Sequence, residues 1–438
     1  MDITAFKNQL QPFISFKSIS TSDHHQKDIV ECANWLKDYL ENSGFDSKVY
    51  PQKNSHPIVF ANKTVDAKLD TVLIYGHYDV VGVGDRNEWE SDPFKVTSKK
   101  DRLIARGIAD NKGQSFIHLH ALKSLIKNNK LQKNVKIIFE GNEETENPDI
   151  ENFILNNKEL LKADTLLVSD GPGFNKMPVI ECSLRGGFVM TLKIKTTKNQ
   201  LHDGINAGGV PNASHELALL ITKLISGKNT VKITGFYDDV DDITEDELNL
   251  MKNLNSDTDI HQSTGLKHLT LKGGESFYEK TGLQPTIQAS SIVSGHVGDG
   301  YGSSIPNEAT AKFLIKTVQS QDTKKVQNLV KSFIEDIIPD YISSEIKTSN
   351  TYSPVKVDSS SNQFKTISKA IKREYGKDPY FRYIGGSIPV ISLFIEHLSV
   401  NPLIVSLANE DCLMHGSNEN LTNETIEKGF SFSTNFFS

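Results

Sequence analysis

The chain has 438 residues, of which 37% are hydrophobic and 24% charged, and its net charge is −7. That length exceeds one ordinary hydrophobic core and predicts two or three domains. The acidic balance offers no basic arm for nucleic acid, and no apolar run approaches the ~20 residues that would span a membrane, so we expect neither partner.

The cysteines and the first residues point to a reduced compartment. Cys32, Cys182 and Cys412 are too few and too widely spaced for a disulfide framework or a Cys-x-x-Cys zinc site. Residues 1–7 lack the basic region and apolar core of a secretory signal. We therefore expect a cytoplasmic protein.

The first part of the chain alternates helices with apolar strands. The unbroken run over 71–75 predicts a strand that is buried on both faces. The predicted elements are a helix over 28–41, strands over 71–75, 135–139 and 165–169, a loop over 107–113 and a helix over 116–126. Strands that alternate with helices indicate a largely parallel sheet.

The pattern changes near residue 183 and returns near residue 352. The intervening elements are partly alternating strands over 188–194 and 310–316 and helices over 213–225 and 323–338, followed after residue 352 by a helix over 364–375 and a strand over 403–405. We predict an α/β fold with a mostly parallel sheet covered by helices on both sides, formed by residues 1–182 and 352–438. Residues 183–351 would form an inserted α+β domain with an open-faced sheet.

Acids and imidazoles follow the predicted strands of the first domain. They are His77 and Asp79 after the first strand, Glu140, Glu143 and Glu144 after the second, and Asp170 after the third. Ligands bind open α/β sheets outside the carboxyl ends of the strands. The hydrophobic pattern therefore predicts that these side chains meet at one edge.

Each residue alone also has an ordinary interpretation. Asp110 could be a helix N-cap, Asp170 a turn residue, and Glu143 and Glu144 solvated surface charges. His77 and Asp79 share a face in extended backbone, and a carboxylate often orients a metal-binding imidazole. Together with His415, these positions form the nitrogen and oxygen donor set that a pair of zinc ions accepts.

The combination of motifs resembles a known family. The motifs are residues 76–81 (Gly-His-Tyr-Asp-Val-Val), 106–113, 140–144 (Glu-Gly-Asn-Glu-Glu), Ser169-Asp170, 385–389 (Gly-Gly-Ser-Ile-Pro) and His415. In this order they resemble the aminoacylase/carnosinase/carboxypeptidase-G family of co-catalytic dizinc metallopeptidases of the MH clan, in its dipeptidase-like branch.

The resemblance implies a role for each site residue. Asp110 would bridge two divalent ions, most simply zinc, with manganese or cobalt as alternatives. His77 and Asp170 would complete one ion's site, and Glu144 and His415 the other. Asp79 would orient His77, and Glu143 would be the general base.

The resemblance also implies that the inserted domain is a lid through which the protein forms a homodimer. Residues 201–209 are similar to a dipeptidase motif whose histidine, here His202, stabilises the oxyanion in a neighbouring subunit. Gly385, Gly386 and Ser387 would lie against the substrate.

The chain departs from the family pattern at two places. Asn307 stands where carnosinase-like members have an arginine that helps bind the substrate carboxylate. Thr145-Glu146-Asn147-Pro148 replaces the usual Gly-Ser after the glutamate pair.

Three functions are compatible with these residues. The leading one is a metal-dependent exopeptidase that hydrolyses dipeptides or short peptides. An N-acyl-amino-acid amidohydrolase would use the same metal site. A catalytically silent binding homologue would be expected to lack a ligand or the base, and every one of those positions is present.

Overall fold

The computed structural model describes residues 1–145, 147–254, 260, 265–271, 274–300 and 302–438, so Glu146 lies outside the described residues. The chain divides into two compact units. The first comprises Met1–Cys182, Val357–Arg382 and Leu393–Ser438, and the second comprises Ser183–Lys356 and Tyr383–Ser392.

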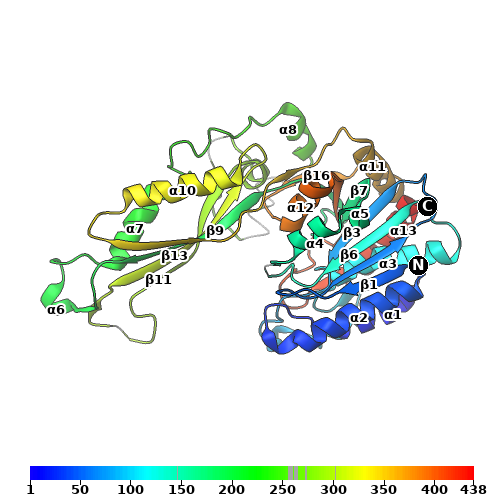
Figure 1. The fold of residues 1–438 in the computed structure, drawn as a ribbon, viewed down its shortest axis with the longest axis horizontal. Coiled ribbons are helices and arrows are strands. Elements are labelled where there is room, and N and C mark those ends of the chain that lie inside the picture. The colour runs from blue at the N-terminus through cyan, green and yellow to red at the C-terminus, as the bar shows by residue number, and fades with distance from the viewer. Residues whose placement is uncertain (146, 255–259, 261–264, 272–273, 301) are drawn as a thin grey trace. The chain divides into compact units, whose positions relative to one another are not determined.

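A nine-stranded sheet, most of which belongs to the first unit, carries the fold (Figure 1). In spatial order its strands are β1 (Asp46–Tyr50), β2 (Ile58–Lys63), β6 (Asn134–Glu140), β3 (Thr71–His77), β7 (Thr165–Val168), β17 (Asn401–Ser406), β8 (Val179–Leu184) and β15 (Val355–Lys356), and β16 (Tyr380–Ile384) pairs with β8. The central strands β6, β3, β7 and β17 are parallel, and antiparallel strands flank them. The predicted α/β class is confirmed.

Helices cover both faces of this sheet. They are α1 (Ile3–Ser15), α2 (Gln26–Asn42), α3 (Lys112–Lys127), α4 (Ile150–Asn156), α5 (Lys158–Leu161), α11 (Asn362–Tyr375), α12 (Pro389–Leu398) and α13 (Asn423–Phe437), with 3₁₀ turns at Asp23–His25 and Arg86–Glu88. Helices α1, α2, α3 and α13 pack together on one face. On the other face, Phe394 of α12 contacts Tyr75 of β3, with the ring centroids 5.9 Å apart.

The start of α3 corrects one predicted boundary. The loop predicted over 107–113 ends two residues too late, because α3 begins at Lys112. Gly113 occupies the first turn, where a β-carbon would lie 1.9 Å from the carbonyl oxygen of Ile108. Only glycine fits this close approach, which brings the loop that carries Asp110 against the helix.

A three-stranded sheet brings two distant loops together. It consists of β4 (Thr97–Lys99), β5 (Arg102–Ile104) and β18 (Asn420–Thr422), with β5 in the centre. The pairing continues past the end of β5, where the Ala105 amide donates to the carbonyl oxygen of Glu419 over 3.0 Å. The segment before Asp110 therefore runs alongside the segment after His415.

The second unit contains an antiparallel sheet with helices on one face. The sheet has the order β11 (Thr286–Ser294), β13 (Glu308–Thr317), β9 (Gly186–Lys195) and β14 (Ser343–Thr348), and the helices packed on it are α7 (Ala213–Leu224) and α10 (Thr323–Ile337). Alternate residues of β9, from Phe188 to Ile194, face these helices and are buried. The remaining elements are β10 (Leu201–His202), α6 (Asp203–Asn206), α8 (Glu245–Met251), a π-helix at Glu279–Leu283 and β12 (Ser304–Ile305).

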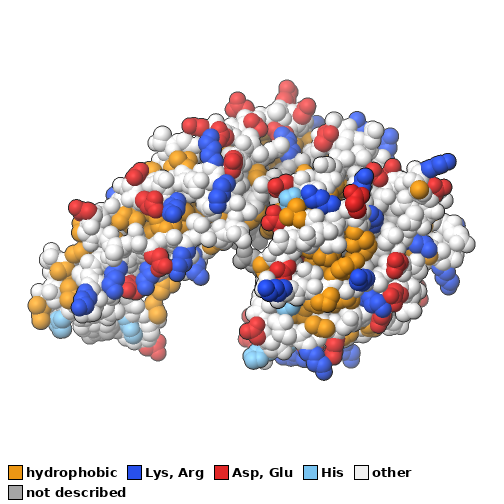
Figure 2. Space-filling model, viewed as in Figure 1, with side chains coloured by type: hydrophobic (Ala, Val, Ile, Leu, Met, Phe, Trp, Pro, Cys, Tyr) orange, Lys and Arg blue, Asp and Glu red, His pale blue; other side chains and the backbone are white. Residues whose placement is uncertain are grey.

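The surface carries mixed charge, and the cysteines lie inside the protein. Figure 2 shows basic and acidic side chains interspersed on the visible face. Among the described residues, no helix is both long and apolar enough to cross a membrane. Cys32, Cys182 and Cys412 are all buried, and none of the three forms a disulfide.

Candidate metal centre

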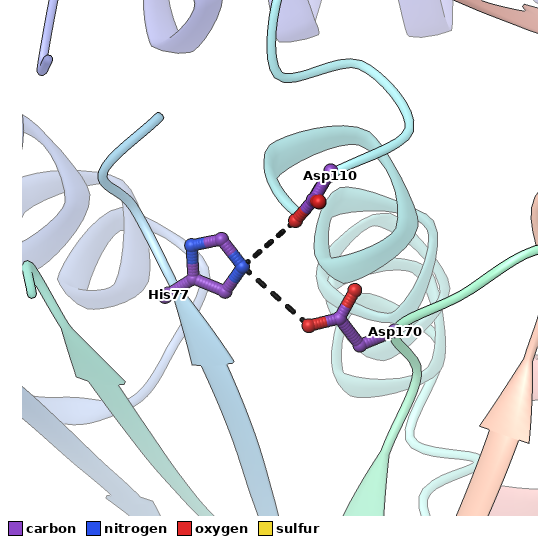
Figure 3. Close-up of side chains that lie close together, drawn as sticks. All are labelled: His77, Asp110 and Asp170. Atoms are coloured by element: carbon purple, nitrogen blue, oxygen red, sulfur yellow. Dashed lines mark hydrogen bonds and ion pairs between the residues drawn. The ribbon is translucent and has the colours of Figure 1, made fainter. Parts of the chain in front are cut away.

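The carboxyl ends of the parallel strands bring the first site residues together. His77 is the last residue of β3, and Asp170 lies two residues beyond β7. Because β3 and β7 are adjacent and parallel, their ends lie at the same edge of the sheet. Figure 3 shows the imidazole of His77 facing both Asp170 and Asp110, and Asp110 comes from the loop before α3.

His77, Asp110 and Asp170 form the first group of donor atoms. Nε2 of His77 lies 3.0 Å from Oδ1 of Asp110 and 3.5 Å from Oδ2 of Asp170. The imidazole is fully buried, and the two carboxylates are only slightly exposed. Three potential ligand atoms thus converge on one small volume.

His415, Asp110 and Glu144 form the second group. Nε2 of His415 lies 3.0 Å from Oδ2 of Asp110 and 3.2 Å from Oε2 of Glu144. Asp110 therefore directs one carboxylate oxygen to each group. This is the arrangement that a carboxylate bridging two cations requires.

The donor geometry fits divalent metal ions. Donor atoms held 2.0–2.2 Å from one ion at tetrahedral angles lie roughly 3.3–3.6 Å apart. The four nitrogen–oxygen distances of 3.0–3.5 Å lie within or a few tenths of an ångström below that range. Oε1 of Glu144 is buried and has no hydrogen-bond partner among the described residues, although a buried carboxylate oxygen normally has one.

Asp79 links His77 to the glutamate loop. Nδ1 of His77 lies 3.1 Å from the carbonyl oxygen and 3.4 Å from Oδ1 of Asp79. The same buried carboxylate accepts hydrogen bonds from the backbone amides of Glu143 and Glu144, at 3.2 and 3.1 Å. One side chain thus sets the orientation of the imidazole and the position of the loop after β6.

Without cations, the site accumulates negative charge in a buried place. Burial raises the pKa of Glu143 well above its ordinary value, and the charges of Asp170 and Asp110 add to the shift against the opposing effect of His77. Hydrogen bonds to Asp110 and Glu144 raise the pKa of His415 to about 10. At neutral pH the imidazole of His415 therefore carries a proton, which a divalent cation would displace on binding.

The predicted substrate residues belong to the second unit and not to this cluster. His202 ends β10, and its side chain is exposed. Gly385 and Gly386 accept hydrogen bonds through their carbonyl oxygens from the side chain and the backbone amide of Arg185. Oγ of Ser387 accepts a hydrogen bond from Nζ of Lys316 over 2.8 Å.

Sequence reasoning missed two residues that hold the site loops. Arg106 and Glu419 form a fully buried ion pair of 2.6 Å, although 313 residues separate them. Arg106 belongs to a quoted motif but received no role, and Glu419 lies four residues after His415. A pairing over this distance leaves no periodic signal in one sequence.

Fold and site together define a metal-dependent peptidase. The chain matches the model of peptidase family M20/M25/M40 over residues 73–438 and belongs to that family. A similar solved structure is the M20 family metallo-carboxypeptidase Sso-CP2 of Sulfolobus solfataricus, with a TM-score of 0.90 and 31% identity over 100% of this chain and 99% of that one.

Two curated relatives extend the comparison. The chain is 27% identical to the Cys-Gly metallodipeptidase DUG1 of Candida albicans, with 95% of this chain and 90% of the relative covered. It is 24% identical to the human Beta-Ala-His dipeptidase, with 87% and 77% covered. These similarities cover nearly the whole chain and support the resemblance inferred from the motifs.

Proposed function

We propose that the protein is a two-metal exopeptidase that acts on dipeptides or short peptides. It would hydrolyse the peptide bond before the C-terminal residue, whose carboxylate is free. The observation that carries this proposal is the pair of three-donor groups that share Asp110. Two of the relatives are named dipeptidases and one is named a carboxypeptidase. Enzymes of both kinds cleave the peptide bond before the last residue, so one residue separates that bond from the free carboxylate.

In this proposal the metal ligands are the five residues of the two groups. His77 and Asp170 would hold one ion, Glu144 and His415 would hold the other, and Asp110 would serve both. Zinc suits the donor set, and manganese or cobalt would also be accepted. Bound as a pair, such ions would lower the pKa of a water molecule toward neutrality and polarise the substrate carbonyl.

The protein's own groups move the protons. The carboxylate of Glu143 takes a proton from the attacking water and then delivers it to the nitrogen of the leaving amine. A base for this step needs a pKa near the working pH, and burial shifts the pKa of Glu143 in that direction. Asp79 orients His77 through its contacts with Nδ1.

We propose that Lys316 binds the substrate carboxylate. Its ammonium group donates to the hydroxyls of Tyr352 and Ser387, both at 2.8 Å. Among the described residues, no carboxylate lies within ion-pair distance of Lys316 or of Arg185. Asn307 cannot replace the family arginine, because its side chain is uncharged and donates to the carbonyl oxygen of Thr197.

We propose that the second unit is a lid and dimerisation domain. β11 is an edge strand of its sheet, and Leu219, Ile292 and Val293 are more than half exposed. An edge strand beside exposed apolar residues is suited to pairing with a second copy of the chain. In such a homodimer, His202 would donate a hydrogen bond to the oxyanion in the partner's site.

We propose the cytoplasm as the working compartment. The three cysteines of the chain are buried and form no disulfide, so the fold does not depend on an oxidising environment.

The test of the function is a substrate panel with the Zn²⁺-loaded enzyme. We expect turnover of unblocked dipeptides, with slower turnover of N-acetyl amino acids. Peptides blocked at the N-terminus separate a carboxypeptidase from a strict dipeptidase. Faster hydrolysis of N-acetyl amino acids than of every peptide would favour the amidohydrolase instead.

Glu143→Gln should retain both metal ions but lose roughly 10²–10⁴-fold in kcat, because the amide cannot accept the proton. Metal analysis and steady-state kinetics measure the two effects. Glu140→Gln is the matched control, since Glu140 ends β6 three residues before Glu143 but accepts a hydrogen bond from the hydroxyl of Tyr75. If Glu143→Gln kept substantial turnover, Glu143 would not be the base.

Lys316→Met should raise KM for a dipeptide by roughly 10–100-fold, because a hydrogen bond to a charged group is lost. KM for the matching dipeptide amide, which has no carboxylate, should change little. Lys316→Arg restores the charge and should recover most of the affinity. An equal effect on the acid and the amide would contradict the assignment.

His202→Ala should lower kcat by roughly 10²–10³-fold through loss of an oxyanion donor, with little effect on the melting temperature. His296→Ala is the control, because His296 is also an exposed histidine of the second unit, and its Nε2 bonds to the carbonyl oxygen of Asp299. Sedimentation should show a dimer. A fully active monomer would contradict the role of His202 in a partner's site.

A further inference from the structure

The carboxylate of Glu419 organises the loop that carries Asp110. Glu419 is fully buried and accepts backbone amide hydrogens from Gly107, Ala109 and Asp110, at 2.9, 2.7 and 3.0 Å. Nη1 of Arg106 donates to the same group over 2.6 Å. Three backbone amides of the loop thus point toward one carboxylate.

Arg106 extends this connection to the loop that carries His415. Its Nη2 donates to the carbonyl oxygens of His415 and Gly416, each over 3.1 Å. The guanidinium group also lies over the ring of Trp89, 5.3 Å from its centroid. The ion pair therefore ties together the backbones of two residues that contribute donor atoms to the metal centre.

The His415 loop needs such support because its backbone is strained. Leu413, His415 and Asn418 all have positive φ angles, of 56°, 60° and 63°. This left-handed conformation is unfavourable for residues with a β-carbon and persists where the surroundings fix it. Arg106 binds the carbonyl group of His415 itself.

A role in overall stability explains this arrangement less well than a role in holding the two loops. Buried ion pairs often contribute little net stability, because desolvating both charges offsets their attraction. Here Glu419 accepts hydrogen bonds from three amides of the Asp110 loop, and Nη2 of Arg106 donates to two carbonyl oxygens of the His415 loop. A shift of either group would move the donor atoms of Asp110 or His415.

We propose that Arg106 and Glu419 are positioning residues that hold Asp110 and His415 at the spacing the two metal ions require. The inference rests on the two-metal function proposed above. Neither side chain touches the substrate in this scheme, and both act through the loops. The second group of donors, with His415 and Glu144, depends on the pair most directly.

The test uses Arg106→Lys and Glu419→Gln in the full-length enzyme. Lysine keeps the charge but cannot form the planar fork that reaches Glu419 and two carbonyl groups. Glutamine keeps the shape but loses the charge. Calorimetric titration of the metal-free proteins with Zn²⁺ should show one site weakened by roughly 10–100-fold, as for other residues that orient metal ligands.

Two further readouts distinguish positioning from general destabilisation. The absorption spectrum of the Co²⁺-loaded variants should differ from that of the native enzyme, because it reports ligand geometry. With Zn²⁺ saturating, kcat should fall more than KM rises. Glu247→Gln is the control: it breaks a 3.0 Å ion pair in the second unit between the buried Glu247 and the exposed Lys356, and it should alter only thermal stability.

The outcomes separate the proposed two-metal function from the proposed positioning role of Arg106 and Glu419. If the native protein bound no Zn²⁺, the proposed function itself would fail. If the native protein bound two ions and Arg106→Lys matched it in affinity, Co²⁺ spectrum and kcat, only the positioning role would be overturned. A weakening of Zn²⁺ binding in Glu247→Gln equal to that in Arg106→Lys would also overturn it. Should Glu419→Gln fail to fold, Arg106→Lys decides alone.

Discussion

The structure depends on one electrostatic constraint: carboxylates that would repel one another are held together in a largely buried site. Asp110, Asp170, Glu143 and Glu144 all lie close enough to affect one another's pKa. The imidazoles of His77 and His415 balance part of this charge when they bind protons, and hydrogen bonds to Asp110 and Glu144 raise the pKa of His415 to about 10. Divalent cations would supply the missing positive charge without protonating the groups that the chemistry needs as bases.

The sheet and its loops hold these charges in place by different means. β3 and β7 run parallel, so His77 and Asp170 come together through backbone pairing alone. Glu144 and His415 lie on loops, and loops need extra hydrogen bonds to be fixed. Asp79 provides them for the glutamate loop, and Arg106 with Glu419 for the other. In both cases a buried charge binds the loop backbone.

These two mechanisms explain what the sequence could predict. The buried strands over 71–75, 135–139 and 165–169 were predictable because unbroken apolar runs have few alternative structures, and their ends located His77 and Asp170. The start of α3 was placed too late because Lys112 and Gly113 resemble loop residues. In the structure Lys112 is buried and donates to the carbonyl oxygens of Phe13 and Phe16. Helices α1 and α13 were not predicted, although Phe6, Leu10, Phe13 and Ile14 of α1 recur at helical spacing. The pair Arg106–Glu419 depends on a tertiary contact, for which a single sequence carries no periodic signal.

The two units divide the proposed work between chemistry and recognition. Every donor atom of the two candidate metal-binding groups comes from the first unit. The departures that bear on substrate recognition lie in the second unit, where Asn307 replaces an arginine and Lys316 remains as a cation without a carboxylate partner among the described residues. A lysine is a compact charge that binds a carboxylate without the planar fork of an arginine. Such a site would require the negative charge of the substrate but constrain its orientation less. In the proposed scheme, this difference would allow a wider range of C-terminal residues without a change in the reaction.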